Sequence, residues 1–478
     1  MLEASPVTSR GDMAGTCRKA SITLGVAVAL AAAITGCGGV GPPTAPAQTT
    51  IAASPDPAAT IRAPAGTGHL RVLVEPQAGM GVVYRLITGA RSSVNLTVYE
   101  LADPMAEADL AAAAARGVNV RVILDQHLER RANTPAYRYL AAHGVHVRWG
   151  PAGVIFHQKT LTVDGATAVI MTGNLVSWDY AGIRDFAVID TSGADITAIT
   201  ATFNADFAGQ PITPPDGADL VWSPTNAQAS VLAIIDGAAS SLLIEDEEMA
   251  DPAVINALAA AARRGVNVRI AMTADPAWDP AFSELVKAGV HVRLYPDNGT
   301  ALYVHAKAIV ADAGRSGQRV LVGSQNFSVA SLDYNRELGV LTGDPAIVSA
   351  IAGSLAGDYS GGVPFSQPAN SGLEPNGPGA RCTATAKVYN ATHDENDVYV
   401  YSNQPGQNAT ASADGYSHSY YTDGSGYALI YLDGPPPGAR ITVTVGGATC
   451  VTRDLAGPCG TSGAPPHVAV PAGCGRVR

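Results

Sequence analysis

The stretch HQKTLTVD at residues 157–164 has a counterpart in HAKAIVAD at residues 305–312. Both read H-x-K-x-x-x-x-D, and 148 residues separate the two histidines. Side chains two places apart lie on the same side of a β-strand, so each stretch predicts a strand that presents an imidazole and an ammonium group together. Only five of the 30 basic residues are lysines, and Lys159 and Lys307 are two of those five. This choice indicates that a compact positive charge is needed beside each histidine.

The sequence around the two stretches is repeated as well. Three pairs of segments match, namely Ser93–Pro104 with Ser241–Pro252, Arg116–Val122 with Arg264–Ile270, and Gly144–Arg148 with Gly289–Arg293. In each half an apolar, β-rich run is followed by Asp-Pro, an Ala-rich segment of helical length and a glycine. Asp103 and Asp251 are the expected N-caps, and Gly117 and Gly265 are expected to end those helices.

This alternation of strand and helix runs predicts the fold class. We expect an α/β protein with two halves, residues 68–220 and 221–362, each with a largely parallel sheet. The two halves are expected to pack about a pseudo-twofold axis. A chain of 478 residues is too long for one ordinary core, so further segments are expected at both ends.

The N-terminal segment is expected to be an export signal. Residues 20–34 are small and apolar, follow Arg18 and Lys19, and are too few for a comfortable membrane span. The run ends in Ile-Thr-Gly-Cys37, which resembles a bacterial lipobox, so residues 1–37 predict a lipoprotein signal peptide with Cys37 as the lipidated residue. An ordinary secretory signal with an incidental cysteine is the alternative, and either Met1 or Met13 could be the start. Residues 38–67 are rich in Pro, Ala and Thr and predict a disordered linker.

The C-terminal part has a different composition. Residues 363–380 predict a linker, residues 381–453 a small β-sandwich-like domain built from short alternating strands, and residues 454–478 a tail that contains cysteines. Four cysteines lie here, namely Cys382, Cys450, Cys459 and Cys474. In an exported chain they are expected to form disulfides, and we favour Cys382–Cys450 and Cys459–Cys474 among the three possible connectivities. The tyrosines of this domain are expected to be packing residues rather than a polymer-binding surface.

Each H-x-K stretch is followed by an amide and then by a carboxylate. Asn174 and Asp185 follow the first, and Asn326 and Glu337 follow the second, at a constant offset of 152 residues. Two such sets in matched contexts resemble the phospholipase D superfamily, over about residues 68–362. The first copy departs from the family pattern because Thr172 stands where the second has Ser324.

The resemblance implies a role for each of these residues. One neutral histidine attacks phosphorus and forms a phosphohistidine, while the other protonates the leaving oxygen and then activates water or an alcohol. Family analogy assigns the first role to His157 and the second to His305, although the symmetric sequence cannot choose between them. Lys159, Lys307, Asn174 and Asn326 are expected to hold the phosphoryl oxygens. The carboxylates of Asp185 and Glu337 are expected to orient the two imidazoles.

The remaining motif residues are expected to support the reacting groups without contacting the substrate. These are Asp164 and Asp312, which we interpret as structural, together with Thr172 and Ser324. No metal or cofactor is expected, since the two lysines supply positive charge. The acidic run Glu245–Glu248 is interpreted as a strand end near the pocket rim, and His146 and His291 as structural residues.

The predicted function is that of a metal-independent phosphodiesterase resembling phospholipase D. A net charge of −11 disfavours a protein that wraps nucleic acid, so phospholipid is the expected substrate and nucleic acid a less favoured one. A nuclease of the same superfamily and a catalytically silent surface-binding protein are the alternatives. We expect a monomer, because both motifs are in one chain, located at the bacterial cell envelope through its lipid anchor or secreted.

Overall fold

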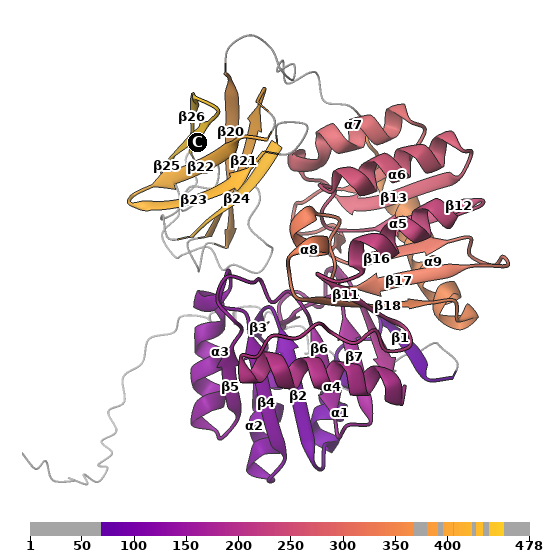
Figure 1. Ribbon diagram of the computed structural model, residues 1–478, viewed down its shortest axis with the longest axis vertical. Helices are drawn as coiled ribbons and strands as arrows, with labels where there is room; N and C mark the ends of the chain where they lie inside the picture. Colours follow the sequence, from indigo (N-terminus) through magenta and orange to yellow (C-terminus); the bar gives the residue numbers. More distant parts are fainter. Residues whose placement is uncertain are drawn as a thin grey trace, which may run out of the picture. The chain divides into compact units, whose positions relative to one another are not determined.

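The computed structural model shows two α/β halves and a separate small all-β domain (Figure 1). It describes residues 68–366, 380–390, 395–404, 406–422, 427–433 and 439–453. The expected duplicated α/β fold with a C-terminal β-sandwich-like domain is confirmed. The predictions for the signal segment, the N-terminal linker, Cys37 and the cysteine-containing tail lie outside the described residues, and so does most of the linker at 363–380.

Half 1 is built on a seven-stranded sheet with the order β1-β10-β7-β6-β2-β4-β5. Its elements are β1 (Leu70–Val74), α1 (Gly81–Gly89), β2 (Ser93–Val98), β3 (Leu101–Ala102), α2 (Pro104–Ala115), β4 (Asn119–Leu124), α3 (Arg130–Ala142), β5 (His146–Trp149), β6 (Thr160–Val163), β7 (Thr167–Met171), β8 (Leu175–Val176), β9 (Ile183–Arg184), β10 (Phe186–Asp190) and α4 (Gly193–Ala208). The short strands β3 and β8 pair with each other outside this sheet.

Half 2 repeats this plan in an eight-stranded sheet with the order β11-β18-β17-β16-β12-β13-β14-β19. Its elements are β11 (Leu220–Ser223), α5 (Ala227–Gly237), β12 (Ser241–Glu245), α6 (Pro252–Arg263), β13 (Asn267–Thr273), a 3₁₀ turn (Pro276–Trp278), α7 (Asp279–Lys287), β14 (His291–Tyr295), β15 (Tyr303–Val304), β16 (Lys307–Ala311), β17 (Arg319–Gly323), α8 (Val329–Asp333), β18 (Glu337–Thr342), α9 (Pro345–Gly361) and β19 (Val363–Pro364).

The expectation of largely parallel sheets needs a correction for the strands next to the motifs. β2, β4 and β5 are parallel, as are β12, β13 and β14, because a helix connects each strand to the next. β6, β7 and β10 pair antiparallel, as do β16, β17 and β18. The connection between β6 and β7 is a tight turn, which permits only antiparallel neighbours. Each sheet is therefore mixed.

The predicted helix ends are confirmed. The side chain of Asp103 accepts hydrogen bonds from two backbone N–H groups in the first turn of α2, and that of Asp251 accepts one from the N–H of Val254 in the first turn of α6. Gly117 and Gly265 follow these helices with φ values of 90° and 92°, a conformation that other residues rarely adopt. The two halves therefore use the same local devices at equivalent positions.

The two sheets share a core with each other as well as with their helices. One face of the half 1 sheet packs against α1, α2 and α3, and one face of the half 2 sheet packs against α5, α6 and α7. The remaining faces meet in a common core to which α4 and α9 contribute, with Phe186, Trp222, Ala308 and Leu338 among its members. The two halves thus form one folding body whose interface is apolar.

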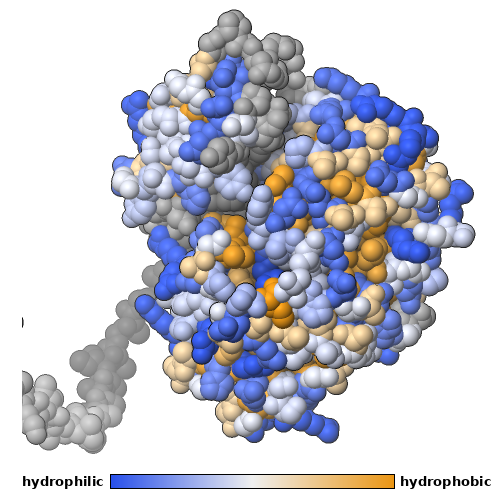
Figure 2. All heavy atoms as spheres, in the orientation of Figure 1, coloured by the Kyte–Doolittle hydropathy of each residue, from blue (hydrophilic) through white to orange (hydrophobic). Residues whose placement is uncertain are grey.

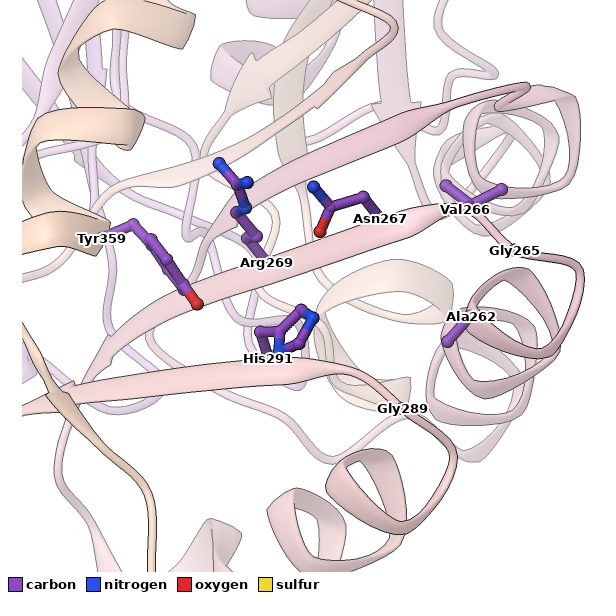
Figure 3. Close-up of a pocket in the computed structure, with 8 residues that line it drawn as sticks. All are labelled: Ala262, Gly265, Val266, Asn267, Arg269, Gly289, His291 and Tyr359. Carbon is purple, nitrogen blue, oxygen red and sulfur yellow. The ribbon is translucent and has the colours of Figure 1, made fainter.

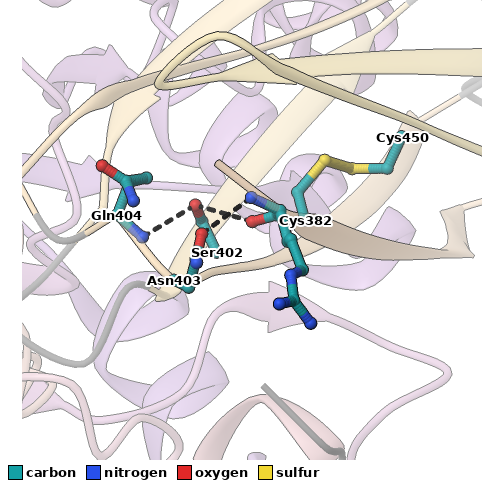
Figure 4. Close-up of a disulfide and its surroundings, with 6 residues drawn as sticks. Cys382, Ser402, Asn403, Gln404 and Cys450 are labelled. Carbon is teal, nitrogen blue, oxygen red and sulfur yellow. Dashed lines mark hydrogen bonds between the residues drawn. A yellow bond between two sulfur atoms is a disulfide. The ribbon is translucent and has the colours of Figure 1, made fainter. Parts of the chain in front are cut away.

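The C-terminal domain consists of two antiparallel sheets with the orders β20-β21-β24 and β23-β22-β25-β26. Its strands are β20 (Cys382–Asn390), β21 (Glu395–Ser402), β22 (Asn408–Ala413), β23 (Tyr416–Tyr421), β24 (Tyr427–Asp433), β25 (Arg440–Val445) and β26 (Ala448–Arg453). Cys382 on the first strand and Cys450 on the last form a disulfide across a Cα separation of 5.7 Å, as predicted (Figure 4). The disulfide thereby closes the domain at both ends of its chain.

The surface shown in Figure 2 is mixed, with small groups of hydrophobic residues between hydrophilic ones. Within the described residues, no helix combines the length and the apolar character that crossing a membrane requires. The apolar residues of α5 and α9 pack into the cores described above.

The final aspartate of each motif holds a turn. Asp164 and Asp312 have φ values of 54° and 52°, in the left-handed region that aspartate tolerates better than most residues. The carboxylate of Asp312 accepts hydrogen bonds from the backbone N–H groups of Ala239, Ser240 and Ser241 at 2.7–2.9 Å. Although partial burial opposes charge, these bonds lower the pKa of Asp312. Asp164 binds Arg91, Ser92 and Ser93 in the same way.

We expect Asp312→Ala to lower the free energy of unfolding by about 2–3 kcal/mol, since it removes charge-assisted hydrogen bonds and leaves a residue that resists positive φ. A lowered carboxyl pKa adds stability above the pKa of the unfolded chain, so the difference from wild type should shrink as the pH falls below 3.8. Urea unfolding at several pH values measures both effects. The exposed Asp236→Ala is the matched control, and an equal loss in both variants would contradict the assignment.

Candidate active site

The two H-x-K pairs lie at the entrances of strands at equivalent positions in the two halves. His157 and Lys159 directly precede β6, and Lys307 is the first residue of β16. Each predicted strand therefore begins later than expected, after both His157 and Lys159 in the first copy and after His305 in the second. Both lysine side chains are almost fully buried, with 1% exposure each, and both histidines are largely buried. Such burial is costly for charged groups, so their partners determine what the site can do.

Each histidine is bonded to a carboxylate from the opposite half. The Nδ1 atom of His157 lies 2.9 Å from Oε2 of Glu337, and Nδ1 of His305 lies 2.9 Å from Oδ1 of Asp185. The sequence predicted one carboxylate for each imidazole but did not show that the pairs are crossed. With Nδ1 donating to a carboxylate, the Nε2 lone pair of a neutral imidazole is left for chemistry.

Backbone contacts between the halves produce this crossing. The N–H of Gln158 donates to the carbonyl of Arg336, which precedes Glu337, at 2.9 Å. The N–H of His305 donates to the carbonyl of Arg184, which precedes Asp185, at 3.3 Å. The short strands β15 and β9 pair next to this second contact. Each motif therefore runs beside the segment that carries its carboxylate, and the two motifs meet at one site.

Hydroxyl and amide groups fix the two carboxylates. Ser331 Oγ donates to Oε1 of Glu337 at 2.6 Å, and Asn335 Nδ2 donates to the same atom at 3.2 Å. Thr172 Oγ1 donates to Oδ1 of Asp185 at 2.5 Å. Burial raises the pKa of Glu337, but the attraction of His157 outweighs it, so that pKa is lowered. The carboxylates are thus held in place for the imidazoles.

The substitution noticed in the sequence, Thr172 where the second half has Ser324, is accommodated without changing the layout. Thr172 accepts a hydrogen bond from the N–H of Phe186 at 2.8 Å, and Ser324 Oγ accepts one from the N–H of Leu338 at 3.1 Å. Both hydroxyls therefore bridge neighbouring strands beside a carboxylate. Because Thr172 donates a hydrogen bond to Asp185, we interpret it as a residue that holds this carboxylate in place.

The two lysines have unlike surroundings. Lys159 Nζ donates to the carbonyl of His157 at 2.6 Å and lies 4.9 Å from the ring centroid of Tyr99. Burial lowers the pKa of Lys159 to about 7, against the opposing attraction of Glu337. Lys307 Nζ donates to the carbonyl of His305 and, at 2.9 Å, to Oε2 of Glu247.

Glu247 is a site residue that the sequence analysis did not identify. The acidic run does start at a strand end, since β12 ends at Glu245, but Glu247 reaches the centre of the site. Its Oε2 lies 3.4 Å from Nε2 of His305, and its Oε1 accepts a hydrogen bond from the hydroxyl of Tyr303 at 3.0 Å. Burial opposes its charge, but the attraction of His305 and Lys307 outweighs burial and lowers the pKa of Glu247.

The repeat offered a sequence signal for this asymmetry. Tyr99 stands at the position equivalent to Glu247, 148 residues earlier. Its ring packs edge-on against His157 with 4.7 Å between centroids. Among the described residues, His157 pairs with a carboxylate through Nδ1 only, whereas His305 has a carboxylate on each nitrogen. Burial, the largest influence, lowers the pKa of His157.

The two asparagines lie next to a second pair of equivalent residues. Asn326 Nδ2 donates to Oε1 of Glu248 at 2.9 Å, and Asn174 Oδ1 accepts from the N–H of Glu100 at 3.4 Å. Oδ1 of Asn326 is buried without a hydrogen-bond partner among the described residues. Burial raises the pKa values of Glu100 and Glu248 to about 7. The amide of Asn174 is therefore positioned by the backbone of Glu100, and that of Asn326 by the carboxylate of Glu248.

The histidines outside the motifs lie elsewhere. His146 and His291 are exposed at the starts of β5 and β14. His291 lines an open hollow of about 550 Å³ on half 2, together with Arg269 and Tyr359 (Figure 3). The guanidinium carbon of Arg269 lies 5.6 Å from the Tyr359 ring centroid, and Arg121 stacks on Phe203 in half 1. None of the residues that line this hollow belongs to the H-x-K motifs.

Two histidines, each with a crossed carboxylate and a buried lysine, on a duplicated α/β unit form an arrangement suited to phosphoryl transfer through histidine. The family model described as cardiolipin synthase, PLD-like domain matches residues 83–207 and 231–358, which is more than half of the chain. The chain therefore belongs to the phospholipase D superfamily, whose members are phosphoryl-transfer enzymes.

More specific relatives are distant. A polyphosphate kinase from Vibrio parahaemolyticus is 22% identical over 277 residues, covering 54% of this chain and 39% of that protein. The phosphatidylserine synthase of Haemophilus influenzae is 13% identical, with a TM-score of 0.49 and coverage of 62% and 88%. The phospholipase D family member Nuc from Salmonella typhimurium is 25% identical, with a TM-score of 0.28 and coverage of 30% and 95%. The chain thus spans less than half the length of the curated kinase.

The pKa values of the free site predict a bell-shaped dependence of kcat/KM on pH. An imidazole attacks only when neutral, and the lowered pKa of His157 puts the acidic limb below 6.5. Lys159, with a pKa of about 7, loses its charge above that pH and gives the alkaline limb. Measurement from pH 5 to 9 on a soluble phosphodiester checks both limbs. On a phosphodiester whose leaving group departs without an acid, Lys159→Arg should be less active but lack the alkaline limb, and a flat wild-type profile would contradict the assignment.

Proposed function

We propose that the protein is a phosphodiesterase that cleaves phospholipid head groups through a phosphohistidine, with hydrolysis or transfer to an alcohol as outcomes. The observation that carries this proposal is the crossed pairing of His157 with Glu337 and of His305 with Asp185 at one site. This pairing supports a mechanism in which one imidazole attacks phosphorus and the other transfers the proton.

The first step uses His157 as the nucleophile. Its Nε2 lone pair attacks phosphorus, and the bond from phosphorus to the leaving oxygen breaks. Glu337 on Nδ1 stabilises the positive charge that the ring gains as the P–N bond forms. The lowered pKa of His157 supports this role, because it keeps the imidazole neutral before attack. Lys159 and the two asparagines are proposed to hold the non-bridging oxygens.

His305 is proposed to be the acid–base group. Asp185 and Glu247 lie against its two nitrogens at 2.9 and 3.4 Å, so their negative charges stabilise a positively charged ring. The ring gives its proton to the leaving oxygen and then takes one from the attacking water or alcohol. Attack of that oxygen on phosphorus breaks the P–N bond and restores His157. The protonation states of both rings are thereby returned to the start.

Exposed apolar side chains close in sequence to site residues support a lipid substrate. Five large hydrophobic residues are exposed in segments that precede or follow site residues by a few positions, namely Met105, Val154, Trp178, Val329 and Tyr334. Val154 precedes His157 by three residues, and Val329 follows Asn326 by three. Such residues suit an amphiphilic substrate, whereas the backbone of a nucleic acid would favour exposed basic residues. The lipobox-like sequence at Cys37 supports placement of the enzyme at a membrane surface.

A nuclease and a catalytically silent binding protein are the two alternative functions. A nuclease would use the same histidines on a polyanion, and the partly buried carboxylates near the site, such as Glu247, Glu248 and Asp179, disfavour that substrate. A silent binding protein would conserve the fold without reaction. Its β domain would then carry the function.

Incubation of the purified protein with phosphatidylcholine vesicles and, separately, with plasmid DNA distinguishes these functions. We expect choline release, little nicking, and activity that survives EDTA. His157→Ala and His305→Ala should each lose at least about 10³-fold in kcat/KM, while the exposed His291→Ala should keep wild-type activity. Nicking without choline release would favour the nuclease, and no reaction with either substrate would favour the silent protein.

A substrate with a good leaving group separates the two histidine roles. With bis(p-nitrophenyl) phosphate, departure of nitrophenolate needs no acid, so His305→Ala should still release a burst of nitrophenol and accumulate a phosphoenzyme on His157. His157→Ala should give no burst. The reverse pattern would exchange the two assignments.

Glu247→Gln should impair the enzyme in a way that depends on the leaving group. Loss of the second carboxylate weakens the support for a charged His305, so kcat for phosphatidylcholine should fall by about 10-fold or more. For bis(p-nitrophenyl) phosphate the first step should change by less than about 3-fold. The exposed Glu284→Gln is the matched control. An equal loss with both substrates would indicate that Glu247 acts on folding or binding instead.

A further inference from the structure

A second group of titratable side chains lies far from the catalytic site, where the first strands of the two halves meet. His69 directly precedes β1, and Asp219 directly precedes β11. Nε2 of His69 lies 2.8 Å from Oδ2 of Asp219. Asp195, in the first turn of α4, completes a set in which one ligand atom of each residue lies within 4.8 Å of the others. We propose that His69, Asp195 and Asp219 bind a divalent metal ion that fastens half 1 to half 2.

A buried oxygen without a partner points to a missing ligand. Asp195 is fully buried, and its Oδ2 has no hydrogen-bond partner among the described residues. Its Oδ1 accepts from the N–H groups of Ala218 and Asp219. The side chain of a second buried carboxylate, Asp190, lies within hydrogen-bonding reach of Asp195; its Oδ1 accepts from the N–H of Ser192, and its Oδ2 likewise has no donor among the described residues. Two buried carboxylate oxygens require a proton or a cation, because burial of uncompensated charge is costly.

The scaffold itself does not require these carboxylates. The N-caps of α4 and α9, Ser192 and Asp344, are equivalent at an offset of 152 residues. At the same offset, half 2 has Thr342 in place of Asp190 and the buried Ile347 in place of Asp195. The fold therefore accommodates neutral or apolar side chains at these positions. Only half 1 carries the acidic residues, and it places them next to the segment that enters half 2.

Close backbone packing forms the wall of the site. Gly217 has a φ of 67°, and a Cβ atom there would lie 2.3 Å from Oδ1 of Asp195. The carbonyl of Asp219 accepts a hydrogen bond from the N–H of Leu341, at the end of β18 in half 2, at 2.8 Å. An ion held by Asp219 and Asp195 would thus tie α4 of half 1 to the edge of the half 2 sheet.

The metal would be remote from the reaction. β10 runs from Phe186, next to the catalytic Asp185, to Asp190 beside the proposed site. At about 3.3 Å per residue, the four steps from Phe186 to Asp190 span roughly 13 Å, so the role of the ion is structural. Residues 68–362 contain no cysteine, and an exported domain without disulfides gains from another cross-link.

The donor set indicates the kind of ion. One imidazole nitrogen and two carboxylate groups suit Zn²⁺ or Mn²⁺, whereas Ca²⁺ and Mg²⁺ favour oxygen ligands alone. His69 is exposed at 44% of its side chain, which gives the ion a path from solvent. We therefore expect Zn²⁺ to bind and Mn²⁺ to substitute for it, with little effect of Mg²⁺.

The test measures metal stoichiometry and thermal unfolding of the full chain after EDTA treatment and removal of the chelator. At Zn²⁺ concentrations about 100-fold above Kd, we expect Tm to rise by about 5 °C. His69→Ala, an exposed position that should not impair folding, should bind one fewer Zn²⁺ per chain and lose this rise. Asp219→Asn should behave in the same way, and the exposed His146→Ala is the matched control.

The difference between wild type and His69→Ala isolates this site from any ion held by the catalytic histidines. Choline release at 25 °C, followed in parallel, should be equal before and after metal removal. Equal Zn²⁺ stoichiometry and equal Tm shifts in wild type and His69→Ala would overturn the proposal. A Tm that responds to pH but not to Zn²⁺ or Mn²⁺ would also overturn it, and would indicate a proton shared by Asp190 and Asp195.

Discussion

The crossed hydrogen bonds between imidazoles and carboxylates are the constraint on which the rest of the structure depends. Glu337 reaches His157 and Asp185 reaches His305, so neither half contains a complete site. The carboxylates can be placed only if the sheets pack with their inner faces together, which the shared apolar core provides. Formation of the site is therefore coupled to folding of both halves. A weaker apolar interface between the two halves would therefore disturb the orientation of the imidazoles more readily than it would disturb either sheet.

Within this symmetric frame, a single pair of equivalent positions sets the two histidines apart. Tyr99 gives His157 an aromatic neighbour, and Glu247 gives His305 and Lys307 a carboxylate. An aromatic edge leaves the neutral imidazole of His157 favoured by burial, whereas a second carboxylate stabilises a charged imidazole. The proposed difference in role between the two histidines therefore rests on residues beside the motif and not on the motif itself, which is the same in both halves.

The helix ends and the division into two halves could be predicted from the sequence, because short local patterns and repeated segments specify them. The N-caps Asp103 and Asp251 follow from residue type and a following proline, and the two halves follow from matching segments. The antiparallel pairing next to the motifs was missed because short apolar runs look alike whichever way their neighbours run. Their spacing from the motifs places Asp185 and Glu337 near the site. Only the contacts between the two halves decide which imidazole each carboxylate binds.

The tertiary structure also determines which charges are present before a substrate arrives. Lys159 is buried and its pKa is about 7, so part of the population is neutral in the free site near neutral pH. A phosphodiester carries negative charge into that site and favours the charged form of the lysine. By linkage, substrate binding must then draw a proton onto Lys159 to the extent that it was neutral before. The buried lysine thus meets the phosphoryl group with full charge, while the free protein avoids part of the cost of burying it.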